Sequence, residues 1–356
     1  MSTVIHERPG VYSAYDASGV VYGGRGGRAV GIAARASSGT VGQAVKLTGY
    51  AAGLSIFGAD AEDRPGMAAM LKLLFQNGVT EVEAVRVADR GATSDYEAAF
   101  AALALCNEVR IVVCDSPDIT VHQALRSSVE EASASRRERI AVVGGNGETI
   151  EALTAHAAEL NSERMVLIGP DALNEAGDTM PAAIAAAALA GVIAAQTDPA
   201  VPVNGVGMAG LGGLSCAYSD NDIDALVRGG VTPLESISGE ISPVRGITTR
   251  TTTGGAGDTT WRELTTILIV DNVIPAIRES LRSKFVRTKN TARNRSAIRS
   301  QVIVELERKL AAEIIDSYGE VTAVASAEDA TVCEVEFRFA VAHGLNQIYL
   351  TAHITV

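Results

Sequence analysis

Residues 139–168 read RIAVVGGNGETIEALTAHAAELNSERMVLI, and this stretch contains the pattern that decides the fold. A short apolar run at 139–143 leads into a glycine-rich turn, a segment of helical length at 150–160 and a second apolar run at 165–168. Short apolar runs bounded by turn residues are typical of buried strands. The stretch therefore predicts a strand, a helix and a second strand parallel to the first.

The same alternation continues on both sides of this stretch. Helical patterns at 96–105 and 121–133 flank an apolar run at 110–114, and the alanine-rich segment 179–197 follows. We therefore predict a Rossmann-like α/β unit over residues 92–200, with a mainly parallel sheet covered on both faces.

Residues 179–197 are uncharged and nearly long enough to span a bilayer. Alanine contributes little transfer free energy, so a buried helix is predicted instead of a membrane span. The first nine residues lack the basic start and apolar core of a secretory signal, and export by that route is not expected.

Segments on either side of the α/β unit, 28–91 and 201–253, are predicted to form one outer domain into which the unit is inserted. The first has strand patterns at 29–33 and 82–87 and a helix at 67–75. The second is glycine-rich and loop-like, with a short helix at 223–227.

Residues 254–346 predict an α+β C-terminal domain behind a linker at 251–257. Residues 265–270 have the composition of a strand, and Pro275 is then expected in the first turn of a helix. A second helix carries an apolar stripe every fourth residue and is predicted to end at Tyr318-Gly319; the stripe is Ile298, Val302, Leu306, Leu310 and Ile314. Strands are expected at 331–339 and 347–356.

The chain ends, 1–27 and 347–356, are predicted to be an extended arm and a linking strand. The alternating pattern of the last strand needs a pairing partner, because an unpaired edge promotes aggregation. That partner lies either within the same chain or in the sheet of a neighbouring copy, and the residues leave both alternatives open.

Charge is unevenly distributed. The whole chain has a net charge of −12, which disfavours nucleic acid as a general partner. Residues 278–299 nevertheless carry +7, with Glu279 as the single acid. Such a segment is either a solvated surface or a binding surface for an acidic partner, and the one-sided sign favours binding. The basic residues are Arg278, Arg282, Lys284, Arg287, Lys289, Arg293, Arg295 and Arg299.

Motifs for catalysis or cofactor binding are weak. The Gly144–Gly147 turn follows a predicted strand and precedes a helix, but it has neither a G-x-G-x-x-G spacing nor a phosphate-binding lysine, and a plain turn explains it equally well.

Three acids lie close together in a polar turn. Asp220, Asp222 and Asp224 are expected to cap a helix, with calcium binding as the alternative. The histidines and the four cysteines suggest no site, and the cysteines are expected to be small buried hydrophobes. We predict no enzyme activity, metal or cofactor; an α/β nucleotide-binding enzyme that uses the glycine turn is the alternative.

Several short segments, in their order along the chain, resemble the contractile tail sheath family of myophages, tailocins and related contractile injection systems. They are Arg8-Pro-Gly-Val-Tyr12, Leu74-Phe-Gln-Asn-Gly78, Val85-Arg-Val87, Val166-Leu-Ile-Gly-Pro-Asp171, Arg245-Gly-Ile-Thr-Thr249, Ile277-Arg-Glu-Ser-Leu-Arg282, Phe285-Val-Arg-Thr-Lys-Asn290 and Ile348-Tyr-Leu-Thr351.

The resemblance implies a structural subunit that polymerises helically around a tail tube, in stacked hexameric rings, and contracts to drive the tube through a target envelope. It implies contacts with tube, baseplate and tail terminator proteins, and none with nucleic acid or by insertion into a membrane. The expected location is a virion tail or tailocin particle assembled in the bacterial host cytoplasm. A different self-assembling shell or tube protein is a further alternative.

The resemblance also assigns roles to residues. It implies that the terminal strands join the sheets of neighbouring subunits, and that the basic segment 278–299 faces the tube. The predicted intersubunit arm residues are Val4, Ile5, Val11, Tyr12, Ile348, Tyr349, Leu350, Thr351 and Ile354.

Overall fold

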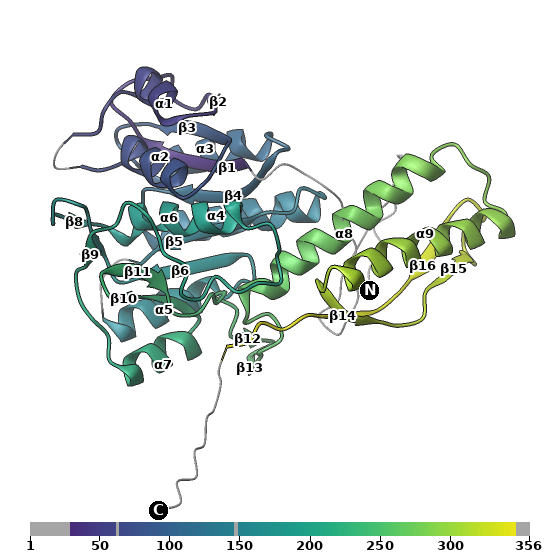
Figure 1. Ribbon diagram of the computed structural model, residues 1–356. Helices are drawn as coiled ribbons and strands as arrows, with labels where there is room; N and C mark the ends of the chain where they lie inside the picture. Colours follow the sequence, from purple (N-terminus) through teal and green to yellow (C-terminus); the bar gives the residue numbers. More distant parts are fainter. Residues whose placement is uncertain (1–28, 62–63, 146–148, 347–356) are drawn as a thin grey trace, which may run out of the picture. The chain divides into compact units, whose positions relative to one another are not determined.

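The computed structural model describes residues 29–61, 64–145 and 149–346 (Figure 1). Within these residues the chain forms two compact units. The sheet unit contains residues up to Thr197 together with 201–265 and 343–346. The hairpin unit contains residues 198–200 and 266–342. The predicted arm residues at both ends of the chain lie outside the described residues.

The sheet unit is built on one eight-stranded sheet. Neighbouring strands from β10 to β3 are parallel, and the edge strands β11 and β2 are antiparallel to their neighbours. Across the sheet the strands are β11 (Glu240–Pro243), β10 (Val231–Ile237), β6 (Met165–Gly169), β5 (Ile140–Gly144), β4 (Val109–Cys114), β1 (Ala29–Arg35), β3 (Val82–Val87) and β2 (Ala44–Leu47).

The central strands are apolar over their whole length because helices cover both faces of the sheet. Every residue of β5 and β6 is buried, as expected for parallel strands. The strands predicted at 110–114, 139–143 and 165–168 are therefore confirmed. Strands from 28–91, 92–200 and 201–253 are all neighbours in this one sheet, so the sheet crosses the predicted domain boundaries.

Residues 201–253 contain the predicted loop-like stretch, at 201–212, and the predicted helix, but two strands were missed. This segment contributes β10 and β11, which form a hairpin through the turn at Ser238-Gly239. Glu235 and Ser236 interrupt the apolar run of β10, and Pro233 weakens the strand pattern further. Parallel pairing of β10 with β6 supplies the hydrogen bonds that the local sequence did not suggest.

The helices form two groups. α1 (Tyr50–Phe57), α2 (Met67–Gln76) and α6 (Ala182–Ala195) pack together over β1, β4 and β5, whereas the second group packs in sequence order along β3 to β10. The second group is α3 (Thr93–Ala104), α4 (Ile119–Ala134), α5 (Ile150–Leu160) and α7 (Asp220–Arg228). The strand order reverses at β1. α1 and α2 precede β3 in the chain, whereas α6 lies between β6 and β10 and returns to pack against α2.

α6 is the buried alanine-rich helix that the sequence predicted. Its small side chains let its backbone lie against β5: a Cβ added to Gly144 would be 1.9 Å from the carbonyl carbon of Ala182. Among the described residues, no helix has both the length and the hydropathy that crossing a membrane requires.

Two small sheets complete the unit. β7 (Ala172–Leu173) pairs with β8 (Thr179–Met180) and with β9 (Gly213–Leu214). β12 (Thr252–Thr253) and β13 (Ala256–Gly257) form a hairpin in the segment that was predicted as a linker. Gly254 and Gly255 have φ values of 58° and 82°, which suits a two-residue hairpin turn. The glycines of 251–257 therefore serve a turn and not a flexible linker.

The hairpin unit begins with two long helices, α8 (Leu264–Phe285) and α9 (Ala292–Ala311). The strand predicted at 265–270 was wrong, because this run is the first part of α8. Its β-branched composition favoured a strand, but Ile269, Val273 and Ile277 lie at helical spacing and pack into one core. Pro275 consequently lies inside the helix and not in its first turn.

The second helix ends seven residues earlier than Tyr318, at Ala311. Val302 and Leu306 are buried and Ile298 and Leu310 pack beside them, as the apolar stripe predicted. Ile314 packs against the same core from beyond the helix. The helix stops because Glu313 adopts a left-handed conformation, with φ 56°.

A two-stranded β-ribbon, residues 315–341, covers these helices. It is made of two paired segments: β14 (Ile315–Tyr318) with β17 (Phe339–Val341), and β15 (Thr322–Ala325) with β16 (Cys333–Glu336). Gly319 N donates to the Arg338 carbonyl between them. The single strand predicted at 331–339 is therefore divided at Phe337-Arg338, where buried Phe337 joins the core.

Candidate functional site

The basic segment 278–299 lies at the tip of the α8–α9 hairpin. It occupies the end of α8, the connecting loop and the start of α9, in the green to yellow-green part of Figure 1. Arg278 and Arg295 are half-buried, and the other six basic residues are exposed. The structure therefore brings the predicted residues together on one mainly exposed element.

Three of these cations form hydrogen bonds within the hairpin unit. Lys284 Nζ donates to Gln301 Oε1 at 2.6 Å, Arg295 donates to Asn290 Oδ1 at 2.9 Å, and Arg299 Nε donates to the Val321 carbonyl at 2.7 Å. The side chains of Arg282, Arg287, Lys289 and Arg293 form no hydrogen bond or ion pair with a described residue. We call these four residues the tip cations.

Gly144 and Gly145, which begin the glycine turn, are explained by packing. A Cβ at Gly144 would overlap the backbone of α6, and one at Gly145 would lie 2.2 Å from Leu153 Cδ2. Residues 146–148 lie outside the described part of the chain. Close packing of α6 and α5 therefore accounts for the two described glycines without a phosphate ligand.

A second position where α/β proteins commonly bind ligands is filled by the protein's own side chains. This position is the carboxyl end of β1 and β4, where the strand order reverses. The Asp115 side chain is fully buried there and accepts hydrogen bonds from Arg35 Nε at 2.8 Å and from the Tyr96 hydroxyl at 2.5 Å. Burial raises the pKa of Tyr96, so its hydroxyl stays protonated and donates to the carboxylate.

Of the three acids predicted to cap α7, Asp222 takes part in the cap, and Ser219 is the N-cap residue. Asp222 N donates to Ser219 Oγ at 3.4 Å and the Asp222 carboxylate accepts from Ser219 N at 3.0 Å, which together form a capping box. The carboxylate also accepts from Ser219 Oγ at 2.7 Å. These hydrogen bonds lower the pKa of Asp222. Asp224 pairs with Arg228. No cluster of histidine, cysteine and acidic side chains among the described residues is arranged to hold a metal ion.

A buried histidine pair was not predicted from the sequence. His122 Nε2 lies 2.7 Å from the Ser116 carbonyl, and His122 Nδ1 lies 2.8 Å from His156 Nε2. A carbonyl can only accept, so Nε2 carries the proton of His122 and Nδ1 accepts from His156. Burial lowers the pKa of His122 to about 3 and also lowers the pKa of His156. The two residues lie 34 positions apart on α4 and α5, so no local motif marks them.

None of the four cysteines forms a disulfide bond with a described residue, and only Cys114 is buried. Cys106, Cys216 and Cys333 are half-buried, so the prediction of small buried hydrophobes holds for one residue of the four. Burial raises the pKa of the Cys114 thiol to about 12, which makes it unreactive at neutral pH.

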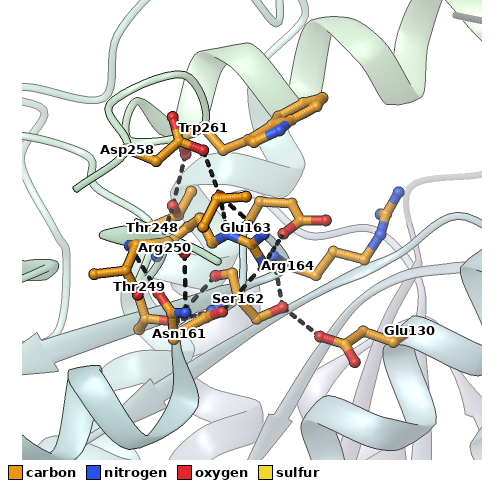
Figure 2. A network of polar contacts seen from close by, with 12 residues as sticks. Glu130, Asn161, Ser162, Glu163, Arg164, Thr248, Thr249, Arg250, Asp258 and Trp261 are labelled. Carbon is orange, nitrogen blue, oxygen red and sulfur yellow. Dashed lines mark hydrogen bonds and ion pairs between the residues drawn. The ribbon is translucent and has the colours of Figure 1, made fainter. Parts of the chain in front are cut away.

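A polar network that the sequence did not reveal ties the β12–β13 region to the turn between α5 and β6 (Figure 2). Asn161 follows α5 with φ 35°, and its Oδ1 accepts from the backbone N–H groups of Thr251 and Thr252 at 3.0 and 3.1 Å. Its Nδ2 donates to the Thr252 carbonyl. One asparagine side chain therefore makes three hydrogen bonds to the hairpin.

Neighbouring residues extend this network. Ser162 N donates to Thr249 Oγ1, and that hydroxyl donates to the Ser162 carbonyl, both at 3.0 Å. Ser162 Oγ donates to Glu130 at 2.6 Å, and Figure 2 shows these side chains converging from α4, the α5–β6 turn and the 248–258 segment. The segment that leads into α8 is thus held to the sheet unit. In the sequence, only the serine and threonine content of this segment pointed to such a network.

We predict that Asn161→Ala lowers the free energy of unfolding by about 2 kcal/mol, because it removes three hydrogen bonds and places alanine in a left-handed conformation. Denaturant titration of the full chain measures the change, and limited proteolysis should show faster cleavage within 251–257. Asn107→Ala, at an exposed position, is the control and should match wild type. Unchanged stability and cleavage of Asn161→Ala would show that the network does not hold the hairpin.

Comparison with known families gives matches over most of the chain. The model of the phage tail sheath protein central domain matches residues 91–249, and the model of the phage tail sheath C-terminal domain matches residues 256–355. The chain belongs to the phage tail sheath family. A tail sheath protein of Bacillus phage SP01 is 30% identical over 254 residues, which are 69% of this chain and 43% of that protein. The sheath chain thus spans less than half the length of this relative.

Solved sheath structures share the fold. The helical sheath of the anti-feeding prophage in its contracted state has a TM-score of 0.73 at 15% identity, covering 98% of this chain and 99% of that one. The PVC sheath complex of an extracellular contractile injection system, also contracted, has a TM-score of 0.72 at 16% identity and covers 99% of both chains. A sheath tail protein from Desulfitobacterium hafniense has a TM-score of 0.69 at 11% identity, covering 94% of this chain and 100% of that one. The matches are to structural sheath proteins, and the nucleotide-binding enzyme alternative has no support.

Proposed function

We propose that this sheath-family chain is a structural subunit that polymerises helically around a tail tube, in stacked hexameric rings, and contracts to drive the tube through a target envelope. The observation that carries the proposal is that both sheath domain models match in chain order, over a fold that is similar to solved sheath structures. We further propose tube, baseplate and tail terminator proteins as partners, in a virion tail or tailocin particle assembled in the host cytoplasm.

Within this proposal the sheet unit is a Rossmann-like body that moves rigidly. Its six parallel strands and two helix groups support that assignment. Because the network around Asn161 holds residues 248–258 to the sheet unit, the 251–257 segment does not absorb the motion of contraction. Rearrangement between subunits supplies the change, as in other rigid-body transitions.

We assign the terminal segments 1–27 and 347–356 to strands that join the sheets of neighbouring subunits. The β-ribbon supports this assignment, because among the described residues it has two strands and therefore two outer edges without a strand beside them. Open strand edges readily accept an added strand. Each subunit would then be linked to its neighbours through contraction.

We assign the basic segment 278–299 to the surface that faces the tube. The tip cations are exposed and form no ion pair with a described residue, so they are suited to an acidic surface, and exposed ion pairs are individually weak. Weak contacts are needed here because contraction separates the sheath from the tube. The driving free energy would come from surface buried between subunits, without a nucleotide or metal ion.

Electron microscopy of the purified protein tests the proposed function. We expect helical tubes of the full chain, and we expect a variant that lacks residues 347–356 to remain folded but unpolymerised. Circular dichroism checks the fold of the variant. A wild-type protein that stays monomeric and binds a nucleotide in calorimetry would contradict the proposal, and tubes formed by the shortened variant would contradict the role of the terminal strand.

A further inference from the structure

The hairpin unit carries a second charged surface, opposite in sign to the basic segment. Residues 313–336 contain seven acids and no lysine, arginine or histidine; the next cation is Arg338. The acids are Glu313, Asp316, Glu320, Glu328, Asp329, Glu334 and Glu336, and all are exposed. The segment has a charge of −7, which matches the +7 of residues 278–299.

None of these carboxylates forms an ion pair with a described residue. Asp329 accepts only from Thr331, through its backbone N–H and its hydroxyl. Since the tip cations also have no ionic partner in the described chain, a single copy carries unpaired charges of both signs within one compact unit. Charges of this kind are available to another molecule.

Strand alternation places part of this acidic segment on the outer face of the β-ribbon. Val335 and Phe337 pack into the hairpin core, so Glu334 and Glu336 point away from it. Across the ribbon Glu334 pairs with Val324, which is 51% exposed, and Glu336 pairs with Thr322. We call the outer side of residues 313–336 the acidic ribbon face.

We propose that the tip cations of one copy bind the acidic ribbon face of a second copy in the sheath polymer without its tube. The complementary charges of the two surfaces select a second copy as the partner, since neither surface pairs with the other inside one copy. Contact between two different surfaces of identical chains is heterologous, and such contacts propagate into rings or helices. This contact rests on the proposed function and adds an interface to it.

The same cations are assigned to the tube in the loaded sheath, so tube and neighbouring ribbon are alternative partners. A tip that rests on the tube leaves the ribbon face of its neighbour unoccupied. When the tube is absent, the tip cations are available to bind the acidic ribbon face of a neighbouring copy. The contact consists of exposed ion pairs, so it weakens as salt screens the charges.

Charge exchange between the two surfaces tests the contact. The tip variant carries Arg282→Glu and Arg293→Glu, the ribbon variant carries Glu334→Lys and Glu336→Lys, and a third variant combines all four substitutions. Sedimentation of full-length protein without tube gives the critical concentration for polymerisation. Each surface variant should raise it about tenfold at 0.1 M salt, and the combined variant should return it close to wild type.

Glu97→Lys with Glu131→Lys, two exposed acids of the sheet unit, is the matched control and should polymerise like wild type. All substituted residues are exposed, and thermal unfolding checks that each variant is folded. Unchanged critical concentrations in the tip and ribbon variants, or a combined variant that is no better than either, would overturn the contact.

Loading onto purified tube separates this contact from the proposed function. The tip variant and the combined variant should load poorly, whereas the ribbon variant should load like wild type. Loss of loading with normal tube-free polymerisation would leave the tube assignment standing and overturn the contact with the ribbon. A wild-type protein that forms no polymer would overturn the proposed function and this contact together.

Discussion

Gly144→Ala is expected to lower the free energy of unfolding by about 3 kcal/mol or more. The added Cβ would lie 1.9 to 2.2 Å from the backbone of Ala182 and Ala183. Backbone atoms cannot rotate away as a side chain does, so α6 would have to move off β5. Denaturant titration of the full chain measures the loss, and soluble yield should fall with it.

Gly257→Ala is the matched control, because a Cβ there meets nothing within 4 Å; its stability should stay within about 0.5 kcal/mol of wild type. The comparison also separates packing from ligand binding as the reason for glycine at 144. A Gly144→Ala protein with wild-type stability would contradict the packing explanation.

His122→Gln is expected to make the protein less sensitive to acid. The glutamine amide can still donate to the Ser116 carbonyl, but it does not titrate, and it gives up the hydrogen bond from His156. We therefore expect a loss of about 1 to 2 kcal/mol at pH 7. This difference from wild type should shrink by about 2 kcal/mol between pH 7 and pH 5, or reverse.

The direction follows from the pKa of His122, which is about 3 in the folded chain and about 6.5 when unfolded. Below pH 6.5 the unfolded chain binds a proton that the folded chain excludes. Wild-type stability is thus full above pH 6.5 and falls by up to about 1.4 kcal/mol per pH unit toward pH 3. Unfolding titrations at several pH values measure this, with His343→Gln, an exposed histidine, as the control. Parallel pH profiles for wild type and His122→Gln would contradict the explanation.

Local sequence correctly predicted the helices and strands whose apolar residue pattern matches their burial in the fold. β5 and β6 are buried over their whole length and β4 and α6 over most of theirs, so nearly every residue in them contributes to the apolar pattern. The start of α8 has β-branched residues and β10 contains Pro233. Both were mispredicted, because helix packing in one case and parallel pairing with β6 in the other outweigh local propensity.

The functional surfaces also differ in whether the local sequence or the tertiary structure reveals them. The basic segment could be found because its charges are contiguous, and its ordered resemblance to sheath proteins identified the family. The Asn161 network and the histidine pair join residues from separate elements, so local sequence did not reveal them. The same holds for the difference between the tip cations and the basic residues that form hydrogen bonds within the hairpin unit.

The sequence by itself determined the family, the α/β character of the central unit and the opposite charge of residues 278–299, because each is a property of contiguous residues. Only the tertiary structure decided that β10 joins the sheet and that Gly144 is needed for packing. It also decided that residues 251–257 form a hairpin, which hydrogen bonds from Asn161 attach to the sheet unit. These features arise from contacts between residues far apart in the chain, and no local pattern records such contacts.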